Sequence, residues 1–154
     1  MATLADKGVF IDTNILIYAT VNSAPWHQDA IAKLQELSAQ GVPLWISRQV
    51  LREFVATLTR PQTFSNPPAR SRVLERVQFL QDNFLVADDN AQVTQKLLEL
   101  IERVEVGGKQ IHDANIVATL LANNIPSLLT HNVSDFERFR SWITLIQLIA
   151  NDSA

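Results

Sequence analysis

Cysteine is absent from the sequence. Its absence excludes a disulfide-bonded scaffold, a thiolate metal site and a cysteine nucleophile, and it fits a reducing compartment. Only four glycines and six prolines occur among the 154 residues, which excludes collagen-like and low-complexity architectures. A net charge of −3 excludes a bulk basic nucleic-acid binder. A polyanionic partner would therefore have to meet a local basic patch or bound cations.

Long hydrophobic runs are also absent. The longest apolar stretch near the N-terminus, residues 15–19, is far shorter than the ~20 residues that a membrane span needs. The first nine residues are too few and too polar for the apolar part of a signal peptide. Hydrophobic residues make up 47% of the chain and charged residues 19%, as in ordinary globular proteins. We therefore expect one domain over residues 1–154, located in the cytoplasm and without a membrane segment.

Short β-rich segments alternate with helical segments along the chain. Strands are expected at 8–11, 43–46, 84–87, 127–130 and 144–148. Helices are expected at 14–19, from Pro25 to near Gly41, from the cap at Ser47 to near Pro61, at 69–83, from 88–90 to 104, from 112–113 to 121 and at 135–140, with a loop at 62–68. The alternation predicts an α/β protein whose mostly parallel sheet is covered by helices on both faces.

Acidic and polar residues follow the predicted strands. In an open parallel sheet, ligands bind beyond the carboxyl ends of the strands, near the point where the strand order reverses. If the first and fourth strands are neighbours, one end of the sheet collects Asp12, Glu53, Asp113, Thr130, Asn132 and Asp135. Converging carboxylates repel one another unless a cation lies between them. Hard oxygen ligands of this kind suit magnesium or manganese.

Each acid also has a purely structural interpretation. Asp12 and Asp135 are suitable N-caps for the helices that follow them. Asp113 is suitable for a first helical turn, where the helix dipole favours a negative charge. Glu53 is suitable for a solvated helix face, paired with a neighbouring arginine. Taken singly, these interpretations are sufficient, and only the convergence at one sheet end favours a metal site.

Six arginines lie between residues 48 and 76, a run that holds only two glutamates and so carries a net charge of +4. Such a run fits a solvated face, and it equally fits a surface for RNA phosphates or for an acidic segment of a partner protein. The candidate contact residues are Arg48, Arg52, Arg60, Arg70, Arg72 and Arg76.

Histidine and tryptophan give weaker signals. No pair of the three histidines has the spacing of a zinc site. His112 and His131 lie next to two of the candidate positions, so either could touch a site there. We interpret Trp26, Trp45 and Trp142 as core or interface residues rather than as platforms for nucleobases.

Four segments resemble the motifs of PIN-domain nucleases, in the same order and at similar intervals. Residues 10–18 (Phe-Ile-Asp-Thr-Asn-Ile-Leu-Ile-Tyr) resemble the opening motif, and residues 52–54 (Arg-Glu-Phe) match the second. Residues 112–118 and 130–136 are similar to the third and fourth. Size and layout most resemble the VapC-type toxins of bacterial toxin–antitoxin pairs.

This resemblance implies a three-layer α/β/α fold and a magnesium-dependent endoribonuclease, with Mn²⁺ able to substitute. It implies metal ligation chiefly by Asp12 and Asp113, with Glu53 and the acid of the fourth motif completing the catalytic set. The family often has an aspartate where this chain has Asn132, whereas the carboxylate here falls at Asp135. Asn132 and Asp135 are therefore both candidates for the fourth position of the catalytic set.

The resemblance also implies supporting residues and partners. Thr130 is expected to orient a ligand or a water molecule through its hydroxyl group, and Asn14 to steady Asp12. The implied partners are RNA as substrate, a second copy in a homodimer, and a small antitoxin protein whose tail lies across the active-site groove. The arginine run is the expected landing surface for RNA or for that tail.

Three other functions fit parts of the pattern. A non-catalytic PIN-like module for protein or RNA interaction would share the fold without the chemistry. A phosphatase of the haloacid-dehalogenase type needs a second aspartate where this chain has Asn14. A DNA-directed nuclease tends to need insertions for gripping a duplex, and this short chain has little room for them.

Overall fold

The computed structural model describes residues 8–61 and 66–149. Five strands form one sheet in the order β3-β2-β1-β4-β5, and every neighbouring pair is parallel. The strands are β1 (Val9–Ile11), β2 (Leu44–Ser47), β3 (Leu85–Ala87), β4 (Ser127–Thr130) and β5 (Thr144–Gln147). The strand order reverses between β1 and β4, which is the place where doubly wound sheets open a crevice for ligands.

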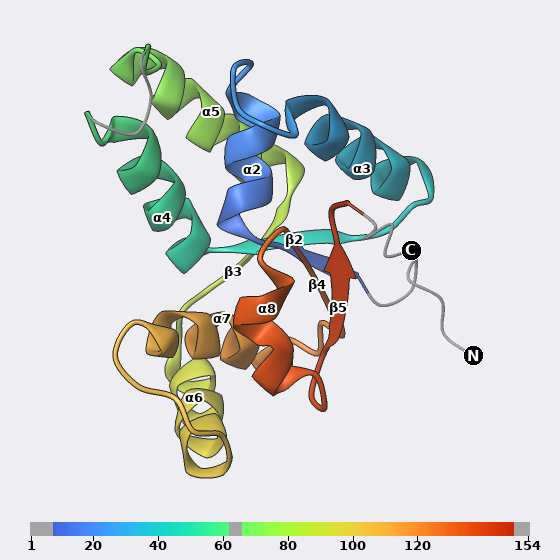
Figure 1. The fold of residues 1–154 in the computed structure, drawn as a ribbon, viewed down its shortest axis with the longest axis vertical. Helices are drawn as coiled ribbons and strands as arrows, with labels where there is room; N and C mark the ends of the chain where they lie inside the picture. Colours follow the sequence, from blue (N-terminus) through green and yellow to red (C-terminus); the bar gives the residue numbers. More distant parts are fainter. Residues whose placement is uncertain (1–7, 62–65, 150–154) are drawn as a thin grey trace.

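Helices cover both faces of the sheet (Figure 1). One layer holds α2 (Thr13–Thr20), α3 (His27–Ala39), α4 (Arg48–Thr59) and α5 (Arg70–Asn83). The other holds α6 (Ala91–Arg103), α7 (Gln110–Ala122), α8 (Val133–Phe136) and the short 3-10 helix η1 (Glu137–Phe139). The predicted three-layer α/β/α fold with a five-stranded parallel sheet is therefore confirmed. None of the helices in the described ranges is long and apolar enough to cross a membrane.

The central strand and the helix after it explain why the start of the sequence is so apolar. All three residues of β1 are buried, with Phe10 fully inaccessible to solvent. Helix α2 packs against α3, α4 and β4, so it buries residues around most of its circumference, among them Ile15 and Leu16. A helix enclosed in this way has little freedom to move. Asp12, between β1 and α2, is therefore held in a fixed place.

The pairing of β1 with β4 brings distant polar residues together. Ile11 pairs with Leu129 in the parallel register, and the amide of Asp12 continues the ladder by donating to the Leu129 carbonyl at 3.0 Å. The next residue of β4 is Thr130. Asp12 and Thr130 therefore lie side by side at the carboxyl end of the sheet.

Three helices begin at places that differ from the sequence prediction. Helix α8 begins at Val133, two residues before the predicted start at Asp135. Helix α3 begins at His27 and not at Pro25, because Trp26 turns the chain in the left-handed region, with φ 57°. Helix α7 begins at Gln110, two residues before the predicted start, because the Gly107 carbonyl accepts from the Gln110 amide at 3.2 Å and closes a turn. Part of the predicted loop at 62–68 lies outside the described residues.

Helix α4, which carries one of the candidate acids, begins at the predicted cap. The hydroxyl of Ser47 accepts from the amide of Val50 at 3.2 Å, and Ser47 is 2% exposed. A buried cap of this kind satisfies one of the amides that the first turn of a helix leaves without a partner. The direction in which α4 leaves the sheet is thus fixed next to the site.

We predict that Ser47→Ala lowers the free energy of unfolding by about 1 kcal/mol, because the amide of Val50 loses its acceptor in a place that water cannot reach. Urea unfolding followed by circular dichroism measures the change. Ser71→Ala, on the exposed face of α5, is the matched control. Equal stability of the Ser47 variant and the wild type would contradict the capping role.

Candidate active site

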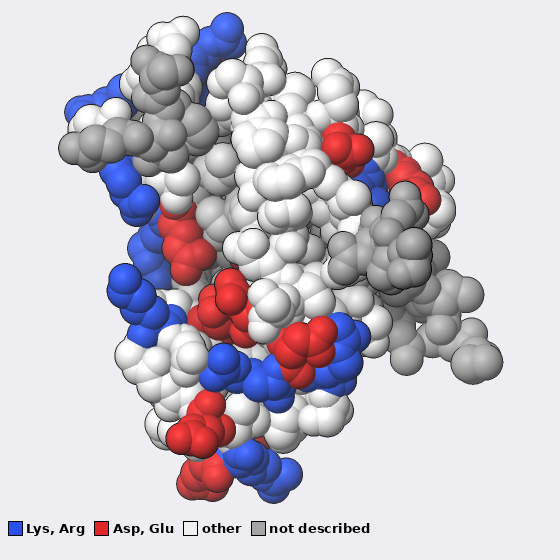
Figure 2. All heavy atoms as spheres, in the orientation of Figure 1, with Lys and Arg blue, Asp and Glu red and all other residues white. Residues whose placement is uncertain are grey.

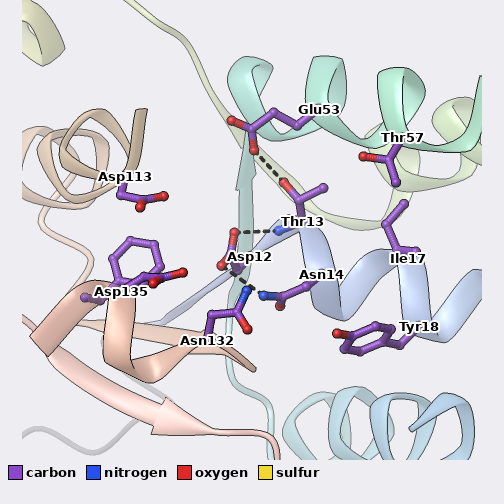
Figure 3. A pocket seen from close by; sticks show the side chains of 11 residues that line it. Asp12, Thr13, Asn14, Ile17, Tyr18, Glu53, Thr57, Asp113, Asn132 and Asp135 are labelled. Carbon is purple, nitrogen blue, oxygen red and sulfur yellow. Dashed lines mark hydrogen bonds between the residues drawn. The ribbon is translucent and has the colours of Figure 1, made fainter. Parts of the chain in front are cut away.

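A cavity of about 490 Å³ opens at the carboxyl ends of β1 and β4. Figure 3 shows side chains from both helical layers converging on it. The four acids predicted from the sequence all line this cavity. The complete lining is Asp12, Thr13, Asn14, Ile17, Tyr18, Glu53, Thr57, Asp113, Asn132, Asp135 and Phe136.

Asp12 is the most enclosed of the acids, with 7% of its surface exposed. Its Oδ1 accepts from the amide of Thr13 at 2.7 Å, so Asp12 caps α2 as the structural interpretation expected. Its Oδ2 accepts from the hydroxyl of Thr130 at 2.7 Å. Burial raises the pKa of Asp12 from 3.8 to about 6, although these hydrogen bonds pull in the opposite direction. The capping role and the site role therefore fall on the same carboxylate.

Thr130 and Asn14 brace this carboxylate. The Thr130 hydroxyl donates to Asp12 and accepts from the amide of Asn132 at 3.1 Å. The side-chain amide of Asn14 lies 3.4 Å from both Asp12 Oδ2 and the Thr130 hydroxyl, and its oxygen accepts from the amide of His131 at 3.2 Å. Asn14 therefore holds the Asp12 carboxylate in place. This position does not supply the second aspartate that a dehalogenase-type phosphatase would need.

Glu53 reaches the same cavity from α4. Its Oε2 accepts from the hydroxyl of Thr13 at 2.8 Å, and its Oε1 accepts from Gln49 Nε2 at 3.0 Å. The structural alternative of an ion pair with a neighbouring arginine is therefore wrong. Arg52, the residue before it, lies instead 3.8 Å from Asp89.

Gln49 is a site residue that the sequence reasoning missed. This side chain, on α4 and 6% exposed, donates both to Glu53 and to the carbonyl of His112 at 2.9 Å. Its own oxygen accepts from Asn115 Nδ2 at 2.7 Å. Gln49 thus joins α4 to α7 and fixes how Glu53 lies relative to the start of α7. The available signal was its spacing of four residues before Glu53, which puts both on one helix face.

Asp113 and Asp135 complete the acidic lining from the other helical layer. Asp113 lies in the first turn of α7 and Asp135 in the first turn of α8. Burial is the main cause that raises the pKa of Asp113 from 3.8 to about 6, and the negative charges of Asp135 and Glu53 contribute to this rise. The residue at the cap of α8 is Asn132, which makes no capping hydrogen bond through its side chain. Asp135 is therefore not an N-cap, and both Asn132 and Asp135 are free to serve the cavity.

The donor set is suitable for a hard divalent cation. Carboxylate, amide and hydroxyl oxygens line the cavity without a cysteine or histidine among them, which is the ligand type that magnesium and manganese prefer. Within residues 8–61 and 66–149, no three acidic or histidine side chains lie close enough to hold an ion jointly. Magnesium needs no such group, since it commonly binds one or two carboxylates and keeps several waters.

The arginines beside the cavity form exposed ion pairs. Arg48 Nε lies 3.2 Å from Asp88 Oδ1, and Arg52 lies 3.8 Å from Asp89. Exposed pairs of this kind contribute little to stability. Both guanidinium groups can therefore exchange a carboxylate for a phosphate at small cost.

Arg76 differs from the other arginines of the run. Its Nε donates to the hydroxyl of Thr20 at 3.2 Å, and its guanidinium stacks on the ring of Phe79 at 4.5 Å. Arg76 therefore already joins α5 to the end of α2. Three further arginines of the run are exposed: Arg60, Arg70 and Arg72.

The chain belongs to the PIN domain family, whose model matches residues 9–140. The match covers strands β1 to β4, the helices of both layers and all four acids of the cavity, and it ends before β5.

Several relatives are VapC ribonucleases. Ribonuclease VapC24 of Mycobacterium tuberculosis is 27% identical over 130 residues, covering 84% of this chain and 89% of the relative. Ribonuclease VapC43 of the same species is 26% identical over 136 residues, covering 84% and 88%.

Solved structures with the same fold include toxin–antitoxin proteins. VapC20 of M. tuberculosis, described as a toxin that cleaves the sarcin-ricin loop, has a TM-score of 0.64 at 16% identity and covers 89% of this chain and 97% of its own. A DNA-bound VapBC complex from Salmonella typhimurium has a TM-score of 0.67 at 18% identity and covers 93% and 99%. At these identities the likeness concerns the fold.

The raised pKa of Asp12 predicts how stability depends on pH. In the folded protein Asp12 keeps its proton up to about pH 6, whereas in the unfolded chain it loses the proton near pH 3.8. The folded state thus holds more protons between these values, so stability falls as the pH rises through that window. In the presence of a chelator, Asp12→Asn should raise the free energy of unfolding by up to about 3 kcal/mol at pH 7.5 and very little at pH 4.

Urea unfolding at the two pH values measures this gain. Asp29→Asn on the exposed surface of α3 is the matched control and should show no such pH-dependent gain. An Asp12→Asn variant that is less stable than the wild type at pH 7.5, or equally stabilised at both pH values, would contradict the account.

Proposed function

We propose that this protein is a magnesium-dependent endoribonuclease that acts as the toxin of a type II toxin–antitoxin pair. One observation carries the proposal: Asp12, Glu53, Asp113 and Asp135 come from distant parts of the chain and line one cavity at the strand-order reversal of a PIN domain. The negative charges of Asp135 and Glu53 add to the effect of burial in raising the pKa of Asp113, so these acids of the cavity repel one another. A fold that keeps such an arrangement needs a cation to use it.

Asp12 and Asp113 are the residues that would hold the magnesium ion, with manganese able to substitute. The carboxylate of Asp113 lies across the cavity from that of Asp12 (Figure 3), and its negative charge contributes to the raised pKa of Asp12. Glu53 and either Asn132 or Asp135 would complete the catalytic set by binding water molecules that the ion keeps. When bound, the ion supplies positive charge next to the scissile phosphate and lowers the pKa of water.

The chain's own residues would position the reactants. Thr130 and Asn14 hold the Asp12 carboxylate in one orientation, and Thr13 and Gln49 do the same for Glu53. With both carboxylates fixed, a water molecule can attack the phosphorus in line with the leaving oxygen. The products are two RNA ends, and no covalent bond to the enzyme is formed.

The arginine run offers a path by which RNA can approach an acidic cavity. Basic side chains gather along the edge of the molecule where α4 lies, next to acidic side chains nearer the centre of the same face (Figure 2). Arg48, Arg52 and Arg60 belong to α4 or its cap and are exposed. Phosphates on either side of the cut would contact these guanidinium groups while the scissile phosphate lies at the acids.

The proposed partners follow from the relatives. Several solved structures with this fold are toxin–antitoxin complexes, from Klebsiella pneumoniae and Haemophilus influenzae among others. We propose that a small antitoxin protein covers the active-site groove, and that the chain forms a homodimer. RNA as the substrate agrees with the cytoplasmic location expected from the sequence.

We predict that Asp12→Asn and Asp113→Asn each abolish RNA cleavage while the circular dichroism spectrum stays that of the wild type. The substitution removes the charge that would hold the cation and keeps the size of the side chain. Total RNA is digested with magnesium or with a chelator, and the cut ends are sequenced. Asp29→Asn should cleave like the wild type. Full magnesium-dependent cleavage by both site variants would defeat the assignment, and a wild type that cuts no RNA would favour a non-catalytic module.

We predict that Arg52→Gln together with Arg60→Gln weakens binding of single-stranded RNA and flattens its dependence on salt. Each phosphate contact that is removed should lower the slope of log K against log salt by ~0.7. Fluorescence anisotropy measures the slope at salt concentrations from roughly 50 to 200 mM, the range over which phosphate contacts are screened. Arg103→Gln on α6, in the opposite helical layer, is the control. An unchanged slope in the double variant would exclude the α4 arginines as phosphate contacts.

A further inference from the structure

We propose that Tyr18, Trp26 and His131, here called the aromatic rim, form a subsite that stacks an unpaired nucleobase of the substrate next to the scissile phosphate. The inference rests on the proposed nuclease function and adds to it a requirement for single-stranded RNA. Neither the acids nor the arginines can impose this requirement, because phosphates are present in every nucleic acid.

The three rings come from three separate segments and pack on one another. The ring centroids of Trp26 and His131 are 4.0 Å apart with the planes at 38°. Tyr18, on α2, lies 5.4 Å from Trp26 and meets His131 edge to face at 5.5 Å and 84°. Such mutual packing fixes the orientation of each ring, so a fourth aromatic group could add to a preformed stack.

Trp26 has a strained backbone conformation in this stack. Trp26 has φ 57° and ψ 20°, in the left-handed region that bulky side chains rarely enter. The conformation costs on the order of 1–3 kcal/mol, and it leaves 39% of the residue exposed. Burial of the indole in the core cannot explain a strained residue that is still so accessible to solvent. Of the two roles expected for Trp26, core or interface, the core role is therefore excluded, and a ligand on the surface would account for the strained conformation.

The aromatic rim is connected directly to the acidic cavity. Tyr18 is itself part of the cavity lining (Figure 3). The amide of His131 donates to Asn14, which braces Asp12. The backbone carbonyl of Tyr18 is 2.6 Å from Nδ1 of His27, the first residue of α3, so the segment that carries Trp26 is bound to the end of α2. The distance between the aromatic rim and the acids is thus fixed by the fold.

An unpaired nucleobase is the ligand that this surface fits. Aromatic side chains stack on any base, since every base has a π face, and stacking contributes ~1–3 kcal/mol per base in single-strand binding. Bases within a duplex stack on each other, so their faces are not accessible to an aromatic side chain. RNA-binding proteins therefore recognise the unstacked bases of loops and ends. A phosphate at the acids with its neighbouring base on Trp26 therefore requires a single-stranded segment.

The test separates stacking from folding by the choice of variant. Trp26→Gly removes the indole and also suits the left-handed backbone, because glycine adopts positive φ without strain. Trp26→Phe keeps an aromatic face. Leu98→Ala, which alters an exposed apolar residue on α6, is the surface control. All are made in an Asp12→Asn background, so that binding is measured without cleavage and with less repulsion of the phosphates.

The probes are a fluorescein-labelled 12-nucleotide RNA of mixed sequence and the same RNA annealed to its complement. We expect Trp26→Gly to weaken single-strand binding by roughly 5- to 150-fold, Trp26→Phe to restore most of it, and Leu98→Ala to leave it unchanged. Binding of the duplex should be weaker and insensitive to Trp26. Thermal melting followed by circular dichroism confirms that each variant is folded.

Equal single-strand affinity of the folded Trp26→Gly variant and its parent would overturn the inference, even if that variant lost binding of a partner protein. An equal loss for duplex and single strand would also overturn it. A stacking subsite should bind a single strand even without the cation that Asp12→Asn is expected to lose. If the parent binds no RNA while the wild type cleaves RNA in the assay described above, the aromatic rim alone is therefore refuted. If the wild type also fails to cleave, the proposed function falls with it.

Discussion

The parallel pairing of β1 with β4 is the constraint on which the site depends. It places the carboxylate of Asp12 beside the hydroxyl of Thr130, 118 residues away in the chain, at a distance of 2.7 Å. Because α2 is enclosed by the sheet and by its neighbouring helices, this carboxylate is buried where its charge is unfavourable. Stability given up in this way is typical of sites that are built for a ligand. The other acids come to the same place because α4, α7 and α8 all begin at that edge of the sheet.

The site combines opposite charges in a small area. Its centre is acidic and would repel RNA, whereas α4 beside it carries exposed arginines. The chain as a whole has a net charge of −3, so long-range attraction to nucleic acid is weak and the local pattern must do the binding. A cation among the acids would convert the centre from repulsive to attractive. Metal binding and RNA binding are therefore expected to be coupled, each favouring the other.

Much of this arrangement was predictable from the sequence, and the reasons are physical. Short apolar segments such as Val9–Ile11 define buried strands, and acids just beyond them fall at the carboxyl end of a parallel sheet. The sequence pattern left open whether β1 and β4 are neighbours, and the structure shows that they pair. Gln49 was missed because two of its three partners, the His112 carbonyl and the Asn115 side chain, lie on another helix, and the packing of two helices cannot be read from either one. The exposure of Trp26 was not predicted, because nothing in a sequence marks a tryptophan as left-handed.

The most direct measurement is a titration of the metal-free protein with Mn²⁺, in which electron paramagnetic resonance records the free ion. The wild type should show a saturable site. That site should be lost in Asp12→Asn and in Asp113→Asn, and it should be kept in the Asp29→Asn control, because only the first two carboxylates face the cavity. Identical Mn²⁺ binding by all four proteins, or no binding by the wild type, would contradict the claim that the folded sheet assembles these acids into one cation site.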